Sequence, residues 1–165
     1  MNASVEHTFL FADLVGFTAF TERVGDETAA DVAIAFQSAA AHAAAELGCE
    51  VVKDLGDAVM IHSRDAARVV ALALRLSREL ELEGWCPPLR IGVHSGPAVQ
   101  REHDWYGATV NVAARLADSA TAGEILMSLR TRDLLAKQTS LTLAARGPRS
   151  FKNVTAPMAV FAAAA

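Results

Sequence analysis

The chain has 165 residues, of which 52% are hydrophobic and 21% charged, and its 15 Lys and Arg against 19 Asp and Glu leave a formal net charge of −4. This length suits one domain with a sizeable core and is too short for two ordinary domains, and the apolar content excludes a disordered chain. The acidic balance argues against a general nucleic-acid-binding protein, which needs a basic surface to neutralise phosphates.

Strand and helix patterns alternate along the first part of the chain. Apolar runs predict strands, and apolar residues spaced three and four apart predict amphipathic helices. We expect strands at residues 8–15, 50–55, 58–63 and 89–95, and helices over 17–47 and 64–83. Gly25 and Asp26 divide the first helical segment, and Asp26 is expected to cap its second part. Gly56 and Asp57 supply the turn between the second and third strands.

This order of strand, helix, hairpin, helix and strand predicts an α+β fold with a ferredoxin-like βαββαβ core. In that arrangement the first and third strands lie side by side, antiparallel, at the centre of the sheet. Asp13 is near the end of the first strand and Asp57 is at the start of the third. The topology therefore predicts that two carboxylates far apart in the sequence meet at one edge of the sheet.

The remainder of the chain adds short C-terminal strands and helices to this core. We expect a hairpin over 98–105, helices over 109–120 and 131–135, and strands at 124–127, 141–145, 150–154 and 159–163. The alanines at 162–165 are expected to form a frayed end. No internal repeat or linker is evident, so we expect residues 1–165 to form a single domain.

Three further classes of protein are disfavoured by the composition. Two cysteines are too few for a disulfide framework. No apolar run approaches the roughly 18 residues of a membrane span, and the N-terminus lacks a basic region followed by an apolar run. We therefore expect a cytoplasmic protein that binds neither membranes nor nucleic acid.

The predicted carboxylate pair suits the binding of divalent cations. Hard cations prefer oxygen ligands, and Mg²⁺ needs only one or two carboxylates when waters and phosphate oxygens complete its shell. Taken alone, Asp13 would be an ordinary strand-end residue and Asp57 an ordinary turn residue. The sequence around them changes that interpretation.

Five segments in order resemble the motifs of class III nucleotidyl cyclases, the adenylate and guanylate cyclases. The segments are residues 11–18, 52–57, 90–96, 104–116 and 151–154. Each is weak alone, but together they lie within residues 8–161 in the order that the family shows. The stretch between Gly96 and Asp104 is short, as in the bacterial type with a shortened dimerisation arm. The resemblance implies the class III cyclase fold.

By this resemblance, Asp13 and Asp57 each contact two divalent cations, Mg²⁺ or Mn²⁺, and the carbonyl of Leu14 helps to hold one of them. The reaction implied is attack of the ribose 3′-oxygen of ATP on its own α-phosphate, which yields 3′,5′-cyclic AMP and pyrophosphate. The nucleophile belongs to the substrate, so no serine or cysteine nucleophile is needed.

The resemblance also assigns residues to the rest of the substrate. Arg90 and Lys152 would hold the triphosphate, Arg90 as a fork of donors and Lys152 as a point charge. Asn111 would orient the ribose, and Arg115 would stabilise charge on the α-phosphate. Asn111 and Arg115 are four apart on a predicted helix and so share one face.

Lys53 and Asp104 are expected to distinguish the bases. Adenine offers an acceptor at N1 and a donor at its 6-amino group, while lysine only donates and aspartate only accepts. Guanine reverses both groups, so it would require a carboxylate in place of Lys53. We therefore expect ATP as the substrate, with a guanylate cyclase as the alternative.

The family places the metal ligands of one subunit against the base- and transition-state residues of the other. This chain carries both sets, so a head-to-tail homodimer is expected. A non-catalytic cyclase-like module that binds nucleotide or dimerises is the other alternative, although such relatives usually lose a metal aspartate or the Asn–Arg pair. A diguanylate cyclase or a polymerase palm is disfavoured by the missing signature of the former and the net charge. Asn153 departs from the family, which usually has glycine there.

Overall fold

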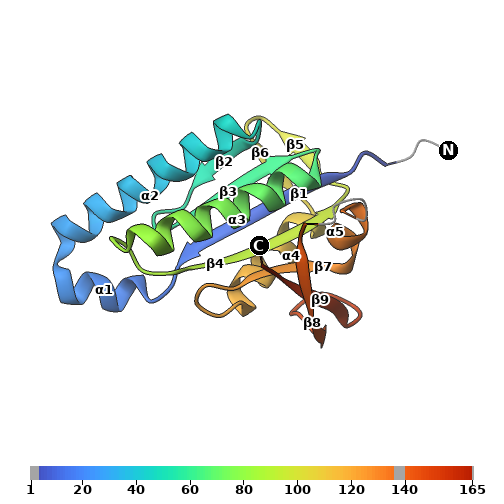
Figure 1. Cartoon of the computed structure of the whole chain (residues 1–165). Coiled ribbons are helices and arrows are strands. Elements are labelled where there is room, and N and C mark those ends of the chain that lie inside the picture. The colour runs from blue at the N-terminus through green and yellow to red at the C-terminus, as the bar shows by residue number, and fades with distance from the viewer. Residues whose placement is uncertain (1–3, 136–139, 165) are drawn as a thin grey trace.

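The computed structural model describes residues 4–135 and 140–164 of the chain. Within these residues it contains a seven-stranded sheet, a separate two-stranded hairpin and five helices (Figure 1). The strands are β1 (His7–Leu14), β2 (Glu50–Asp54), β3 (Ala58–Ser63), β4 (Leu89–Gly96), β5 (Val99–Arg101), β6 (Asp104–Tyr106), β7 (Ile125–Ser128), β8 (Thr142–Arg149) and β9 (Met158–Ala164). The helices are α1 (Phe17–Val24), α2 (Asp26–Glu46), α3 (Ala66–Glu83), α4 (Ala108–Ser119) and α5 (Leu129–Leu134).

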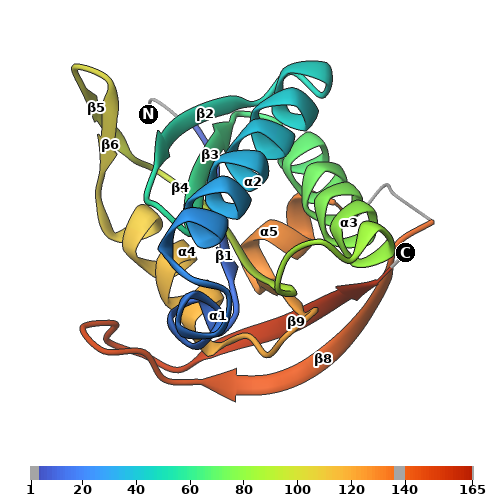
Figure 2. The ribbon, with the colours of Figure 1, turned by 90° about the vertical axis from the view of Figure 1, so that its left-hand side faces the viewer.

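The large sheet has the order β2-β3-β1-β4-β7-β9-β8, with β1 between its antiparallel neighbours β3 and β4. This arrangement confirms the predicted βαββαβ core, and β7, β8 and β9 extend it beyond β4. Helices α2 and α3 pack on one face of the sheet and α4 on the other (Figure 2). The β5–β6 hairpin forms a second sheet and projects from the rest of the molecule in the same view.

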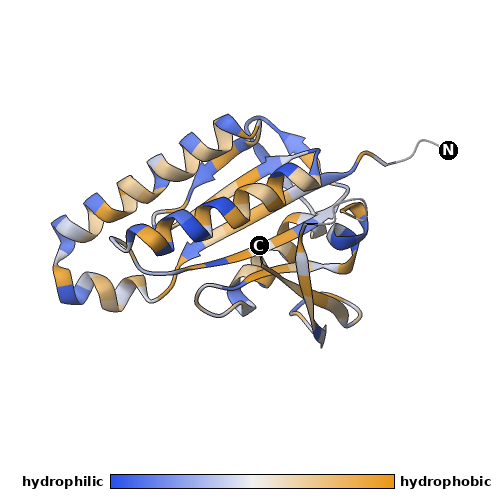
Figure 3. Ribbon diagram, in the orientation of Figure 1, coloured by the Kyte–Doolittle hydropathy of each residue, from blue (hydrophilic) through white to orange (hydrophobic). Residues whose placement is uncertain are grey.

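Helix α3 shows how local signals and burial fix an element. The Asp65 side chain caps it by accepting from the backbone N–H groups of Ala67 and Arg68 at 3.0 and 3.3 Å, and Gly84 ends it in the left-handed region with φ 66°. Its buried face carries Val69, Leu72, Leu76 and Leu80. Figure 3 shows hydrophobic residues along the central strands that this helix covers. None of the helices in the described residues is long and apolar enough to cross a membrane.

Three details of the sequence-based prediction are wrong. Gly25, rather than Asp26, is the N-cap of α2; Asp26 is already in the first helical turn, where its charge still complements the helix dipole. The strand expected at 150–154 is absent: β8 extends to Arg149, and the residues after it form the turn that leads to β9. The alanines at 162–164 belong to β9, where Ala162 pairs with both Leu126 and Ala144. Pairing with distant strands, which local pattern does not reveal, decides the last two.

The contact between β4 and α4 is unusually close at Gly92. A β-carbon at this position would lie 2.2 Å from the backbone nitrogen of Ala117 and 2.5 Å from the backbone oxygen of Ala113. Only a residue without a side chain lets the helix backbone approach the strand so closely. Gly92 therefore sets the distance of α4 from the centre of the sheet.

We expect Gly92→Ala to lower the free energy of unfolding by about 1–3 kcal/mol, because the added methyl group meets backbone that cannot rotate away. For a domain of this size, that loss lowers Tm by several degrees in a thermal melt followed by circular dichroism. Ile91→Val is the control, since Ile91 faces the α3 side of the same strand and loses one methylene without forcing α4 to move. A Gly92→Ala protein that melts like the wild type would contradict the close contact.

Candidate active site

Asp13 and Asp57 lie together at one edge of the central sheet, as the topology predicts. Asp13 is paired with Ala58 across β1 and β3, so Asp57 is one residue beyond the end of that pairing. The backbone N–H of Leu14 donates to the carbonyl of Asp57 at 2.9 Å and fixes this junction. Burial raises the pKa of the Asp13 carboxyl, and the negative charge of Asp57 adds to the rise. A cation beside the pair would relieve both effects.

Arg90 supplies positive charge to this pair. It lies opposite Asp13 in the β1–β4 register, and its Nε and Nη2 atoms donate to Oδ2 of Asp13 at 2.9 and 2.6 Å. These hydrogen bonds oppose the rise in the pKa of Asp13. The geometry thus places a cationic group on the carboxylate that the sequence assigns to metal binding.

The donor set fits a divalent cation that is shared with a substrate. Two carboxylates and the nearby carbonyl of Leu14 are hard oxygen ligands of the kind that Mg²⁺ and Mn²⁺ accept. In residues 4–135 and 140–164, no group of three or more His, Cys, Asp or Glu side chains could hold a metal ion. A cation held by Asp13 and Asp57 would therefore take its remaining ligands from water and phosphate oxygens.

Lys53 and Asp104 form a second pair, brought together from β2 and β6. The Lys53 Nζ donates to Oδ2 of Asp104 at 2.8 Å, and the Trp105 backbone N–H donates to Oδ1 at 2.8 Å. The hydrogen bond from Lys53 is the main reason that the pKa of Asp104 lies below its ordinary value. Both side chains remain partly exposed, at 41% and 30%, so their polar atoms are within reach of a ligand.

A cavity of about 510 Å³ lies between α4 and the turn that follows β8. Asn111, Arg115 and Lys152 all line it, which confirms that the first two share one helix face. Asn153, also in the lining, adopts φ 66°. Asparagine tolerates this left-handed conformation better than most residues other than glycine. The turn is therefore kept although Asn153 replaces the glycine that is usual in the family. Arg90 is not among the described residues that line this cavity.

Asp118 is a residue of this region that the sequence analysis missed. Its backbone oxygen accepts from Nη1 of Arg90 at 3.0 Å, and its carboxylate lies 3.7 Å from Nη2 of Arg90 and 4.0 Å from Nη1 of Arg115. It therefore links the arginine on the carboxylate pair to the arginine in the cavity. Its position three residues after Arg115 on the same helix is a signal that spacing could have given.

Comparison with known proteins agrees with this arrangement. A family model described as the adenylate and guanylate cyclase catalytic domain matches residues 1–162. The chain is 36% identical over 135 residues to an adenylate cyclase of Streptomyces coelicolor and 37% identical over 117 residues to one of Streptomyces griseus, which covers 78% and 71% of this chain. The matches cover 35% and 29% of those proteins, so the chain spans about a third of the length of these curated relatives.

Solved structures show the same fold. The adenylyl cyclase CyaB from P. aeruginosa superposes on the chain with a TM-score of 0.86 at 22% identity, over 97% of this chain and 94% of that one. At this identity the likeness concerns the fold. The family model, which covers nearly the whole sequence, confirms the resemblance seen in the five motifs, and the chain therefore belongs to the adenylate and guanylate cyclase catalytic domain family.

Proposed function

We propose that the chain is the catalytic domain of an adenylate cyclase that converts ATP to 3′,5′-cyclic AMP and pyrophosphate as a head-to-tail homodimer. The observation that carries this proposal is the meeting of Asp13 and Asp57 at one sheet edge in a chain that also keeps Asn111 and Arg115. We further propose that residues 1–165 form one catalytic domain and that it works in the cytoplasm, where its substrate is made and used.

Asp13, Asp57 and the carbonyl of Leu14 would hold the two divalent cations. When bound, such ions acidify the attacking ribose hydroxyl and neutralise the leaving pyrophosphate. Arg90 already hydrogen-bonds to Asp13. In the substrate complex we expect its guanidinium to turn to the phosphate oxygens, whose geometry matches its fork of donors. The carbonyl of Asp118, which accepts from Nη1 of Arg90 at 3.0 Å, would help to keep Arg90 at the site.

The cavity beside α4 suits the reacting part of the nucleotide. Its volume of about 510 Å³ is within the usual range for small-molecule sites, roughly 300–1,000 Å³. Asn111 would orient the ribose so that its 3′-oxygen faces the α-phosphate. Arg115 would stabilise the negative charge that grows on that phosphate, and Lys152 would bind the phosphate chain.

The head-to-tail dimer would complete two equivalent sites, each with the carboxylate pair of one subunit and the Lys53–Asp104 pair and cavity of the other. The β5–β6 hairpin exposes Val99 and Tyr106, at 48% and 55%, on paired positions of its two strands. Exposed apolar groups on a projecting hairpin support its use as the short dimerisation arm.

Adenine would insert at the Lys53–Asp104 pair, with Lys53 donating to N1 and Asp104 accepting from the 6-amino group. A guanylate cyclase remains the alternative for the base, and a module that binds nucleotide without turning it over remains the alternative for the reaction. The retained Asp13, Asp57, Asn111 and Arg115 favour the enzyme over the module.

Assays of ATP and of GTP, each with Mg²⁺ and with Mn²⁺, should give cyclic AMP as the faster product. Asp57→Asn removes one negative charge from the cation site without changing its shape, and we expect turnover to fall at least about 100-fold. Asp54→Asn, a neighbouring aspartate outside the proposed site, is the matched control and should retain activity. If neither nucleotide yields a cyclic product with either metal, the chain is not a cyclase.

Mixing two inactive variants tests the shared site. Asp13→Ala and Arg115→Ala damage opposite halves, so a mixed dimer has one intact site of two, and equal amounts should recover about one quarter of wild-type activity. Asp13→Ala mixed with Asp57→Ala is the control, because both changes damage the same half and no intact site forms. Equal activities in the two mixtures would rule out the shared-site dimer.

A double change tests base recognition. Lys53→Glu combined with Asp104→Asn supplies the acceptor and donor that guanine requires, so we expect the ratio of kcat/KM for ATP to that for GTP to fall by a factor of about 10 to 100. Steady-state kinetics with both nucleotides measures the ratio. An unchanged ratio would show that this pair does not read the base.

A further inference from the structure

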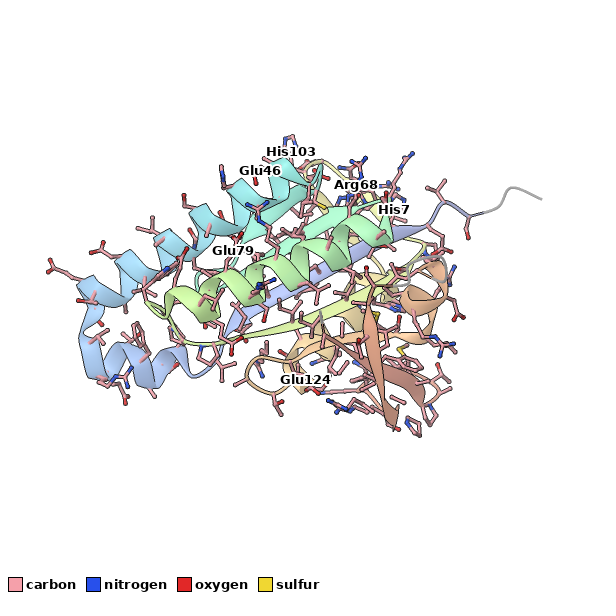
Figure 4. The ribbon with its side chains drawn as sticks, in the orientation of Figure 1. His7, Glu46, Arg68, Glu79, His103 and Glu124 are labelled. Carbon is pink, nitrogen blue, oxygen red and sulfur yellow. The ribbon has the colours of Figure 1, made fainter. Side chains whose placement is uncertain are left out.

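A cluster of buried rings lies at the end of β1 opposite to Asp13. It comprises His7, His62 and Trp105, with relative exposures of 6%, 7% and 7%. The indole of Trp105 stacks on the His62 ring with 4.3 Å between centroids and an interplanar angle of 29°, and it lies 4.5 Å from the ring of His7. Figure 4 labels His7 near the point where the chain enters the sheet. The proposed reaction makes no use of either histidine.

Hydrogen bonds hold the imidazoles of His7 and His62 in a fixed relative orientation. His62 Nδ1 lies 3.2 Å from Oε2 of Glu50, and His62 Nε2 lies 2.9 Å from Nδ1 of His7. A carboxylate can only accept, so Nδ1 of His62 carries its proton and Nε2 accepts from His7. Burial is the main cause that lowers the pKa of both histidines, which favours the neutral form of both rings.

Trp105 connects this cluster to the second charged pair. Its indole Nε1 is buried and has no hydrogen-bond partner in the part of the chain that the structure describes. The orientation of the ring therefore depends on packing against His62, His7 and Phe9. The backbone N–H of the same residue donates to Oδ1 of Asp104. A shift of the indole would thus move the group that aims the Asp104 carboxylate.

The other member of the pair is tied to the same cluster through β2. Glu50, which orients His62, and Lys53, which binds Asp104, are on this one strand. The β5–β6 hairpin, in contrast, pairs with no strand of the large sheet. The packing of Trp105 on His62 and His7 is therefore one of the main contacts that attach the hairpin to the sheet.

We propose that His62, held in place by Glu50 and His7, is a positioning residue for adenine recognition: its ring fixes Trp105, and Trp105 fixes the carboxylate of Asp104. His62 acts through Trp105, and its loss should loosen the hairpin and weaken discrimination between bases. This inference rests on the proposed role of Lys53 and Asp104 as readers of the base.

Two substitutions separate the ring of His62 from its hydrogen bonds. His62→Gln keeps polar atoms but has no ring to support Trp105, and we expect it to lower the preference for ATP over GTP about 10-fold, mainly through a higher KM for ATP. His62→Phe keeps a ring under the indole and should retain most of the preference. Binding of the α,β-methylene analogues of ATP and GTP, which cannot release pyrophosphate, measures the same preference without turnover.

The matched control is His94→Gln. His94 is equally buried, at 8%, on β4, which β1 separates from the strand of His62; its Nδ1 lies 2.7 Å from the Ser128 hydroxyl oxygen, away from Trp105. This change also removes a buried, hydrogen-bonded imidazole, but it should leave the nucleotide preference unchanged. In a Trp85→Phe background, acrylamide quenching of Trp105 fluorescence should increase in His62→Gln and stay as in the wild type in His94→Gln.

Three results would overturn the inference. The first is a His62→Gln protein with wild-type nucleotide preference and wild-type quenching of Trp105. The second is an equal loss of preference in His94→Gln, which would indicate a general loss of stability. The third is an unchanged preference in Lys53→Glu/Asp104→Asn, which would also remove the proposed base reading; if that variant shifts the preference and His62→Gln does not, only the inference is wrong.

Discussion

The antiparallel pairing of β1 with β3 and β4 is the constraint on which the rest of the structure depends. Both faces of β1 are buried, with Leu10 and Ala12 against α2 and α3 and Phe9 against α4. A slip of one residue would turn each set to the wrong face, so the register is strongly determined. That register sets Asp13 opposite Ala58 on one side and opposite Arg90 on the other. The carboxylate pair and its arginine follow directly from packing of the core.

The same register explains how an acidic protein can be suited to the nucleoside triphosphate proposed as its substrate. The carboxylates at the sheet edge need positive charge, and Arg90 provides it, held in turn by the carbonyl of Asp118 on α4. Helix α4 can lie this close because Gly92 has no side chain. A net charge of −4 therefore says little about the cavity beside α4, which Arg115 and Lys152 line together.

The hairpin carrying Asp104 is positioned by different forces. It lies outside the large sheet, so no ladder of backbone hydrogen bonds sets its angle. Aromatic packing of Trp105 on His7 and His62 and the ion pair of Asp104 with Lys53 hold it instead. Side-chain packing of this kind can be altered by one substitution, whereas the carboxylate edge is built into the sheet. The two halves of the proposed site thus differ in how easily their geometry can change.

The sequence by itself determined the order of elements, the meeting of Asp13 with Asp57 and the shared face of Asn111 and Arg115, because these follow from local periodicity and from the few ways in which a βαββαβ core can be connected. It did not predict the turn over 150–154 or the contacts of Asp118. Only the tertiary structure decided that Arg90 binds Asp13 and that Glu50, His62 and His7 support Trp105. These contacts join residues far apart in the chain, such as Asp13 and Arg90 at a separation of 77 positions, and they depend on strand register and side-chain packing, which no local pattern encodes.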